Sequence, residues 1–161
     1  MKKNNIHIKS FSYSDKKELL RLIPCFSNWF NDPKSLHLTN SKAKFPFNIK
    51  NWISTEYRDI NTEVLLCLKN DWIIGHVGYK INLDDYNARI FHLIIDPNER
   101  KKKHGHDMIR FVEDLVQKKC IKNVTTTLLK RNQPAVDLFI SRGFIKIKDI
   151  NGKYAKFRKT F

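Results

Sequence analysis

The sequence predicts an α/β (α+β) fold in which a central, mostly antiparallel sheet is flanked by helices. Its 161 residues suit a single domain, spanning 1–161, that buries a core without disulfides or metals. Short apolar runs give six to seven candidate strands, and helical patterns separate several of them. Three of these strands follow one another between residues 64 and 96 with only turns between them, as antiparallel neighbours do.

The N-terminal part is predicted to be a strand followed by a helix. Residues 6–11 alternate between apolar and polar positions. Asp15 and Glu18 resemble a capping pair in front of an apolar face that begins at Leu19. Pro24 has no backbone N–H, so we expect the helix to kink or end there, although apolar residues continue its face.

A segment rich in turn residues follows. The Asn-Asp-Pro sequence at 31–33 breaks the helical pattern, and residues 31–48 are expected to be loop-rich. Residues 42–47 mix cations with aromatic side chains, which suits either the mouth of a ligand site or an ordinary surface connection. Residues 51–57 then have the pattern of a short helix.

The middle of the chain is predicted to form three antiparallel strands. Residues 64–68 are an apolar run, residues 69–71 a hairpin turn, and residues 72–79 a longer strand. A turn at residues 84–87 leads into a third strand at residues 88–96.

The C-terminal part alternates between helices and strands. Residues 124–129 are rich in β-branched side chains and predict a strand. Asn132 opens a helical pattern that Gly143 ends as the first residue beyond the helix. Residues 144–147 and 154–157 predict a last hairpin.

A basic turn connects the strand at residues 88–96 to the next helix. Arg100 to Lys103 are four consecutive cations, and helical spacing of apolar residues begins at Met108. The N-terminus of a helix carries partial positive charge and exposes free backbone N–H groups, so it binds anions and does not favour cations. The order of strand, basic turn and helix therefore predicts a phosphate-binding site.

The composition also favours an anionic ligand. Lys and Arg number 31 against 16 Asp and Glu, which gives a formal net charge of +15 at pH 7. This charge attracts a nucleotide cofactor, a nucleic acid or an acidic surface without choosing among them. Lys, Asn and Ile are abundant throughout, so a compositional bias explains part of the charge equally well.

The cysteines and the apolar runs bear on the cellular compartment. Cys25, Cys67 and Cys120 are widely separated and lack the close pairs that zinc sites use, so we expect reduced thiols and no metal. No stretch approaches the roughly 20 apolar residues of a membrane span, and no apolar run follows the N-terminal residues 1–5. We therefore expect a cytoplasmic protein without a membrane partner.

Two local motifs accompany this order of elements. Residues 93–108 read Leu-Ile-Ile-Asp-Pro-Asn-Glu-Arg-Lys-Lys-Lys-His-Gly-His-Asp-Met, and residues 132–144 read Asn-Gln-Pro-Ala-Val-Asp-Leu-Phe-Ile-Ser-Arg-Gly-Phe. The motifs and the order of elements resemble the GNAT superfamily of N-acetyltransferases. In that family a strand ending in Leu-x-Val-x-Pro is followed by Arg-x-x-Gly-x-Gly and a helix; Arg100 and Gly105 match, and Lys103 replaces a glycine. The second family motif is Asn followed by Ala and Leu-Tyr-x-x-x-Gly-Phe, with Phe139 here in place of tyrosine.

The resemblance implies a more specific fold and a co-substrate. GNAT proteins have a mixed, mostly antiparallel sheet that splays between its fourth and fifth strands, with about four helices around it. They transfer the acetyl group of acetyl-coenzyme A to an amine. The resemblance places the pantetheine arm along the fourth strand and the pyrophosphate on the basic turn. The implied coenzyme site comprises Leu93, Ile94, Ile95, Arg100, Lys101, Lys102, Lys103, His104, Gly105, His106, Asn132 and Phe139.

Catalytic residues are less clearly marked. By resemblance, the backbone N–H of Leu93 faces the thioester oxygen, where it stabilises developing negative charge. An amine with a pKa of ~10 must lose a proton before it attacks. His92 is our first choice of base, with His76 and Tyr79 on the neighbouring strand as alternatives; a packed histidine and a core tyrosine are the competing interpretations. No cysteine lies in a motif for an acyl-enzyme, so we expect direct attack in a ternary complex.

The acceptor is expected to be a small-molecule amine. Polyamines and aminoglycosides need an acidic pocket, for which Asp84 and Asp85 are the main candidates and Glu56, Asp59 and Glu63 weaker ones. The net charge of +15 fits a phosphate-bearing acceptor better, such as an amino sugar linked to a nucleotide. An aminoglycoside and the N-terminus of a protein of the ribosomal type are the alternatives within the family.

The sequence is also compatible with two functions other than acetyl transfer. A nucleic-acid-binding module would use the basic turn together with the cations Lys146, Lys148, Lys153, Lys156, Arg158 and Lys159. A non-catalytic relative that binds coenzyme A would explain Lys103, Arg89 and Phe139 at positions where the family has other residues. A monomer and a homodimer are both compatible with the sequence.

Overall fold

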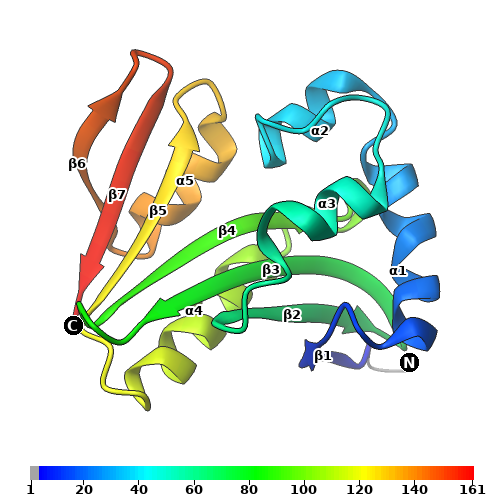
Figure 1. The fold of residues 1–161 in the computed structure, drawn as a ribbon, viewed down its shortest axis with the longest axis horizontal. Coiled ribbons are helices and arrows are strands. Elements are labelled where there is room, and N and C mark those ends of the chain that lie inside the picture. Colours follow the sequence, from blue (N-terminus) through cyan, green and yellow to red (C-terminus); the bar gives the residue numbers. More distant parts are fainter. Residues whose placement is uncertain (1–3) are drawn as a thin grey trace.

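The computed structural model describes residues 4–161, and its centre is one sheet of seven strands (Figure 1). The strand order is β1-β2-β3-β4-β5-β7-β6, and only β4 and β5 are parallel. The mixed, mostly antiparallel sheet predicted from the sequence is thereby confirmed. The strands are β1 (Ile6–Phe11), β2 (Thr62–Lys69), β3 (Trp72–Asn82), β4 (Asn87–Ile95), β5 (Asn123–Leu129), β6 (Ile145–Ile150) and β7 (Tyr154–Thr160).

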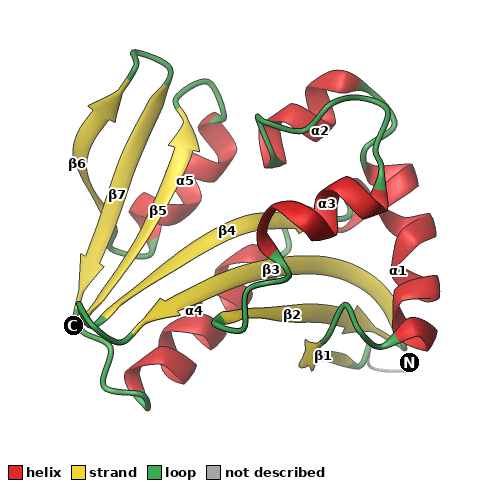
Figure 2. Cartoon of the chain, viewed as in Figure 1, coloured by secondary structure: helices red, strands yellow, loops and turns green. Residues whose placement is uncertain are grey.

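Helices cover both faces of the sheet (Figure 2). They are α1 (Lys16–Trp29), α2 (Pro33–Thr39), α3 (Ile49–Glu56), α4 (His104–Gln117) and α5 (Gln133–Ser141), with a short 3₁₀ turn at Pro97–Glu99. One apolar cluster joins the sheet to α4 and α5, and a second joins it to α1, α2 and α3. The two clusters give the two faces of the sheet different chemistry, and the second contains most of the aromatic contacts.

Several local signals in the sequence form the structures they predict. The Asp15 carboxylate accepts a hydrogen bond from the Glu18 N–H at 3.2 Å and begins α1. Gly143 has a φ of 91°, and the N–H of Phe144 donates to the Phe139 carbonyl at 3.1 Å in a Schellman motif that ends α5.

The structure decides part of two expectations about the N-terminal helices. Of the two outcomes expected at Pro24, a kink or an end, the end is wrong, because α1 continues to Trp29 and buries Leu22, Phe26 and Trp29 against the sheet. This burial outweighs the one backbone hydrogen bond that Pro24 cannot donate. The segment at residues 31–48 is loop-rich, as expected, but it also contains the short helix α2, in which Pro33 occupies the first turn and Leu36 is fully buried.

β4 and β5 separate along most of their length, as the family resemblance implied. Their pairing is restricted to residues 87–89 and 123–125. Beyond these residues the strands diverge, and β5, β7 and β6 lean away from the rest of the sheet (Figure 1). The sheet is thus open between its fourth and fifth strands, and this opening holds the candidate site.

Candidate functional site

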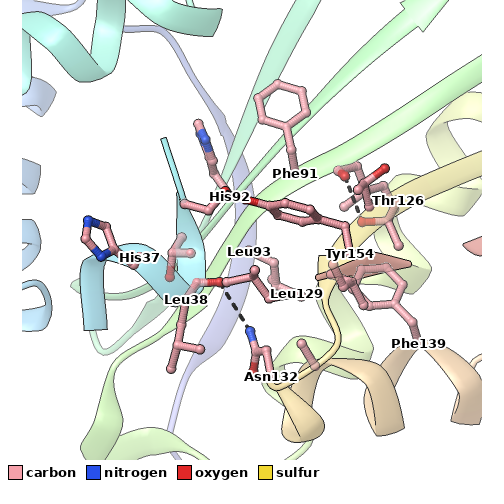
Figure 3. Close-up of a pocket in the computed structure, with 16 residues that line it drawn as sticks. His37, Leu38, Phe91, His92, Leu93, Thr126, Leu129, Asn132, Phe139 and Tyr154 are labelled. Atoms are coloured by element: carbon pink, nitrogen blue, oxygen red, sulfur yellow. Dashed lines mark hydrogen bonds between the residues drawn. The ribbon is translucent and has the colours of Figure 1, made fainter. Parts of the chain in front are cut away.

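A cavity of about 100 Å³ lies where β4 and β5 separate. β4 forms one wall, β5 and α5 form the other, and α2 with the turn after it closes one end (Figure 3). None of the 16 lining residues is Asp, Glu, Lys or Arg, whereas five carry hydroxyl groups. The five are Thr39, Ser41, Thr126, Thr127 and Tyr154.

A β-bulge in β4 shapes the cavity wall. The β3–β4 register pairs His76 with Ile94 and Gly78 with Phe91, so His92 and Leu93 are left without a partner on β3. His92 takes a left-handed φ of 50°. Bulges redirect side chains and interrupt the ladder of hydrogen bonds. By resemblance, the backbone N–H of Leu93 was expected to contact the thioester oxygen of acetyl-coenzyme A. The bulge lies at this residue, and the contact itself stays a prediction.

His92 belongs to a network of aromatic and imidazole side chains beneath the bulge. Its Nδ1 lies 2.6 Å from the Tyr57 hydroxyl. The His76 Nδ1 lies 2.9 Å from the His92 carbonyl oxygen, and the His76 Nε2 lies 2.8 Å from the Tyr13 hydroxyl. The Trp52 Nε1–H donates to that same hydroxyl at 2.7 Å. The pattern of the sequence did not single out Tyr57, Tyr13 or Trp52, because each lies more than 30 residues from its hydrogen-bond partner in this network.

Burial keeps both histidines of this network neutral. It lowers the pKa of His76 to about 4, against a weaker opposing effect of the His92 carbonyl. Burial also lowers the pKa of His92 to about 3, with smaller contributions from His76 and Arg89. His92 lines the cavity and His76 does not. Of these two candidate bases, only His92 reaches the opening of the sheet.

Tyr79 lies on the other face of the sheet from this network. It is buried in the cluster of α4 and α5, and burial raises the pKa of its hydroxyl to about 12. The preceding Gly78 faces Tyr57, where an added Cβ would lie 3.0 Å from the Tyr57 Oη. Because neighbouring strand residues point to opposite faces, Tyr79 does not meet His92.

The basic turn reaches the N-terminus of α4 in an unusual backbone conformation. Lys103 is the residue before the helix and has a φ of 68°, the left-handed region in which glycine is at no disadvantage. Lys101 also has a positive φ, of 62°. Lys103 makes no side-chain cap, so the first backbone N–H groups of α4 stay available to an anion.

The side chains of the turn divide into two groups. Lys102 pairs with Glu99 at 3.2 Å, and Lys69 pairs with the same carboxylate at 3.0 Å and lowers its pKa. Lys101 and Lys103 form no ion pair with any residue from 4 to 161. Their ammonium groups are therefore the cations of the turn that are free to meet a phosphate.

Other residues of the predicted coenzyme site make contacts with neighbouring residues of the protein itself. The Arg100 Nε–H donates to the carbonyl of Ile95, the last residue of β4, at 3.1 Å. Gly105 packs closely against α5, because an added Cβ would lie 2.9 Å from the Leu138 Cδ2 and the end of that side chain would have to shift. His104 is buried at the start of α4, where its Nε2 lies 3.8 Å from the Glu99 carboxylate. His106 is half-buried in the same first turn of α4.

Asn132 and Phe139 face the cavity from the β5 side (Figure 3). The Asn132 Nδ2–H donates to the carbonyl of Leu38 at 3.2 Å, which ties α2 to the start of α5. The Tyr154 hydroxyl makes a second tie, donating to Ser41 Oγ at 2.8 Å. Phe139 is almost fully buried against Phe144 and brings no hydroxyl to the site.

The candidate acidic residues do not form a pocket at this cavity. Glu56 pairs with Arg89 at 2.9 Å, and Asp59 pairs with Lys80. Asp84 and Asp85 lie in the turn between β3 and β4, next to the end of the sheet where β4 and β5 are still paired.

The cysteines also lie outside the cavity lining. Burial raises the pKa of the Cys67 thiol to about 11, and it also raises the pKa of the Cys25 thiol. Cys120 is exposed. A nucleophilic thiolate at the cavity is therefore not available from these residues.

Comparison with known proteins gives one family and many structures of the same fold. The sequence profile of the acetyltransferase (GNAT) family matches residues 15–144. A search of curated protein sequences finds no match. A domain from Methanocaldococcus jannaschii DSM 2661 superposes with a TM-score of 0.77 at 21% identity, over 99% of this chain and 100% of that chain.

Two further structures of similar fold are those of N-acetyltransferases. PaiA N-acetyltransferase from Thermoplasma acidophilum, solved in complex with coenzyme A, has a TM-score of 0.73 at 19% identity and covers 98% of this chain and 99% of its own. A chimera of the spermidine N-acetyltransferase SpeG from Vibrio cholerae and hSSAT has a TM-score of 0.70 at 16% identity, with 96% and 95% covered. Among the described residues, no helix has the length and apolar character required to cross a membrane.

Proposed function

Because the chain belongs to the acetyltransferase (GNAT) family and is thus an acyltransferase, we propose that it transfers the acetyl group of acetyl-coenzyme A to the primary amine of a small molecule. The amine attacks the thioester directly in a ternary complex, within a single domain of residues 1–161. The observation that carries the proposal is the cavity between β4 and β5, bordered by the β4 bulge and lined by His92 and Leu93.

The coenzyme lies across the β4 edge with its pyrophosphate at the N-terminus of α4. The available N–H groups of that helix and the unpaired ammonium groups of Lys101 and Lys103 support this placement. The shared fold of PaiA, which was solved with coenzyme A, supports the same co-substrate. Arg100 contributes by holding the end of β4 in place.

The chain's own residues have distinct roles in the transfer. The Leu93 N–H stabilises the oxyanion that forms as the amine attacks, a type of contact whose loss typically costs on the order of 10²-fold in rate. His92 accepts the amine proton, because it lines the cavity beside Leu93 and its ring is neutral; its low pKa, about 3, makes it a weak base. Phe139 has no proton to give, so the departing thiolate takes its proton from water.

The acceptor is a hydroxylated amine that carries phosphate, such as an amino sugar linked to a nucleotide. Five hydroxyl groups and no carboxylate line the cavity, which suits a sugar ring. Lys42 and Lys44 follow Ser41 at the cavity rim, are exposed, and form no ion pair with a described residue. They can meet a phosphate of the acceptor. Spermidine, the substrate named for SpeG, is a polycation and would find no acidic partner in the lining.

The test is acetyl-coenzyme A consumption with release of free thiol, measured against a panel of acceptors. The panel pairs glucosamine with its nucleotide-linked form and adds spermidine, an aminoglycoside and a peptide N-terminus. We expect turnover with the nucleotide-linked amino sugar to exceed that with the free sugar, and spermidine to be inactive. Preferential turnover of spermidine or of the peptide would contradict the proposed acceptor.

A coenzyme titration separates this function from nucleic-acid binding. Coenzyme A binding should be saturable and should displace acetyl-coenzyme A. Duplex DNA binding through the basic residues would instead weaken with salt by a log-log slope of about −0.9 per phosphate contact.

A further inference from the structure

The register of the β6–β7 hairpin divides its cations between the two faces of the sheet. Neighbouring residues of a strand point to opposite faces, and residues paired across two strands point to the same face. On β7, Ala155 and Phe157 are buried in the cluster of α4 and α5, so Lys156 between them points to the opposite face. Lys148 of β6 is paired with Lys156 and shares that face, and Arg158 lies two residues further along β7. These three residues are called the hairpin cations below.

The face of β5, β6 and β7 that carries the hairpin cations is open. In Figure 1, α5 lies behind β5, whereas α1, α2 and α3 lie on the side of β1 to β4. The apolar cluster beneath α1, α2 and α3 has no member from β5, β6 or β7 among residues 4–161. Lys148 and Arg158 are exposed, and Lys156 is half-buried. All three side chains are therefore accessible to a ligand.

The hairpin cations have no carboxylate partner in the described part of the chain. Asp149 is the one acidic residue in β5, β6 and β7, and it lies on the opposite face. There it pairs with Lys146 at 3.3 Å and with Lys130 at 2.9 Å. Lys159 also lies on that face and pairs with Glu113 at 3.0 Å. By contrast, the hairpin cations form no ion pair with any residue from 4 to 161.

Two of the hairpin cations repel each other directly. Lys148 and Lys156 are opposite each other on adjacent strands. Residues in this arrangement have Cβ atoms about 5 Å apart, and like charges there destabilise a sheet. Arg158 lies about 7 Å further along the same face of β7. An anion with two or more charges would offset the repulsion and accept charge-assisted hydrogen bonds, so the group suits a phosphate or a diphosphate.

The hairpin cations adjoin the cavity between β4 and β5. Lys156 is paired with Thr127 of β5, which lines the cavity. Tyr154, two residues before Lys156 on the same face, also lines it (Figure 3). Adjacent strands are about 4.8 Å apart, so Lys156 lies one strand and Lys148 two strands from the cavity wall. A phosphate attached to a sugar ring within the cavity would meet these side chains.

The pyrophosphate of the coenzyme has a separate place. The helix α4, at whose N-terminus we propose that it binds, belongs to the cluster that contains Ala155 and Phe157. This cluster lies on the opposite face of the sheet from the hairpin cations. They are therefore free for an anionic group of the acceptor while coenzyme A is bound.

We propose that Lys148, Lys156 and Arg158 form the binding site for the phosphate or diphosphate group of the acceptor, in addition to Lys42 and Lys44 at the cavity rim. The site would select phosphorylated over unphosphorylated amino sugars. This inference rests on the proposed function for the identity of its ligand, and it adds the residues that recognise the phosphate.

Titration with inorganic diphosphate tests the site without turnover. The protein is ¹⁵N-labelled and saturated with coenzyme A, so that the N-terminus of α4 is occupied. We expect saturable changes in the backbone amide signals of Lys148 and Lys156. The Kd should rise about 10-fold in each of Lys148→Gln and Lys156→Gln, because one charge-assisted hydrogen bond is lost.

Lys146→Gln is the matched control. It removes a cation from the same strand, but from the opposite face, where Lys146 pairs with Asp149. Its Kd for diphosphate should equal that of the wild-type protein. An equal Kd in the wild-type protein and all three variants would overturn the site.

Acceptor kinetics test whether the site serves the reaction. In Lys148→Gln and Lys156→Gln, we expect the KM for nucleotide-linked glucosamine to rise about 10-fold. The kcat, the KM for acetyl-coenzyme A and the KM for free glucosamine should be unchanged. Duplex DNA that displaces diphosphate, together with an unchanged KM for the nucleotide-linked sugar, would assign the face to a nucleic acid and overturn the inference.

The outcomes separate this inference from the proposed function. Diphosphate binding at Lys148 and Lys156 without transfer to any acceptor would contradict the proposed function and support the anion site. Transfer to the nucleotide-linked sugar with the same KM in the wild-type protein and both variants would support the proposed function and overturn the site.

Discussion

Lys103 occupies a backbone conformation that favours glycine, at the position where the family motif has one. Its φ of 68° is in the left-handed region, which costs a residue with a side chain roughly 1–2 kcal/mol. The same residue places an ammonium group beside the N-terminus of α4. The substitution thus combines a cost in stability with an electrostatic gain for an anionic ligand.

Lys103→Gly separates these two effects. We expect the free energy of unfolding to rise by roughly 0.5–1 kcal/mol, because the strain is removed and glycine loses more entropy on folding. We also expect coenzyme A to bind several-fold more weakly at low salt, with the difference vanishing at high salt. Urea denaturation and calorimetry at two salt concentrations measure the two quantities.

Lys103→Arg is the control, since it keeps the charge and the strain. It should match the wild-type protein in both measurements. Equal salt dependence of coenzyme binding in Lys103→Gly and Lys103→Arg would exclude an electrostatic contribution of this side chain.

Single residues also show the limits of prediction from sequence. Arg100, Gly105 and Asn132 could be placed near the opening because they belong to local motifs. Their individual contacts could not be predicted, since Gly105 packs against Leu138 and Asn132 donates to Leu38, 94 residues away. Tyr57 carried no signal at all, because its importance arises only from the packing of α3 against the bulge of β4.

At the scale of elements, α1 shows tertiary packing overriding a local signal. Pro24 removes one hydrogen bond within the helix, yet α1 is continuous because its buried face extends on both sides of the proline. Strands and turns were predicted better, since period-two alternation and positive-φ turn residues act locally. Asn70 and Asp71 have φ values of 50° and 68°, as a tight hairpin requires.

Pro24→Ala should therefore stabilise the protein. Alanine restores the missing N–H and removes the clash of the ring with the preceding turn, so we expect the free energy of unfolding to rise by about 1–3 kcal/mol. Urea denaturation monitored by circular dichroism measures the change. A lower stability would mean that the proline ring makes packing contacts worth more than the hydrogen bond it prevents.

At the scale of the whole molecule, the two faces of the sheet carry different parts of the proposed reaction. The face covered by α4 presents the helix terminus at which we propose that phosphate binds, and the face covered by α1 to α3 holds the hydrogen-bonded network of His76 and His92. The bulge in β4 joins the two, because it is the one stretch of that strand without partners on either neighbour. The sequence predicted the splay only through the family resemblance, since pairing between distant strands has no local signal.

The buried His76 and the half-buried His92 make the stability of the folded protein depend on pH. The pKa of His76 falls from 6.5 to about 4 and that of His92 from 6.5 to about 3 on folding. Between these values the unfolded chain binds more protons than the folded one, so stability is full above pH 6.5 and decreases as the pH falls. His76 alone should account for roughly 3 kcal/mol by pH 4. Urea denaturation between pH 7 and pH 4.5 measures the slope.

His76→Asn should flatten this slope. The asparagine amide can replace the Nδ1–H that donates to the His92 carbonyl, and it does not titrate in this range. His7→Asn is the control, because His7 is exposed and its loss should leave the slope unchanged. The paired carboxylates of Asp59, Glu99 and Asp149 have lowered pKa values, so their contributions are lost only at more acidic pH and do not interfere above pH 4.5. An equal slope in His76→Asn and wild type would show that His76 is not the group whose protonation opposes folding.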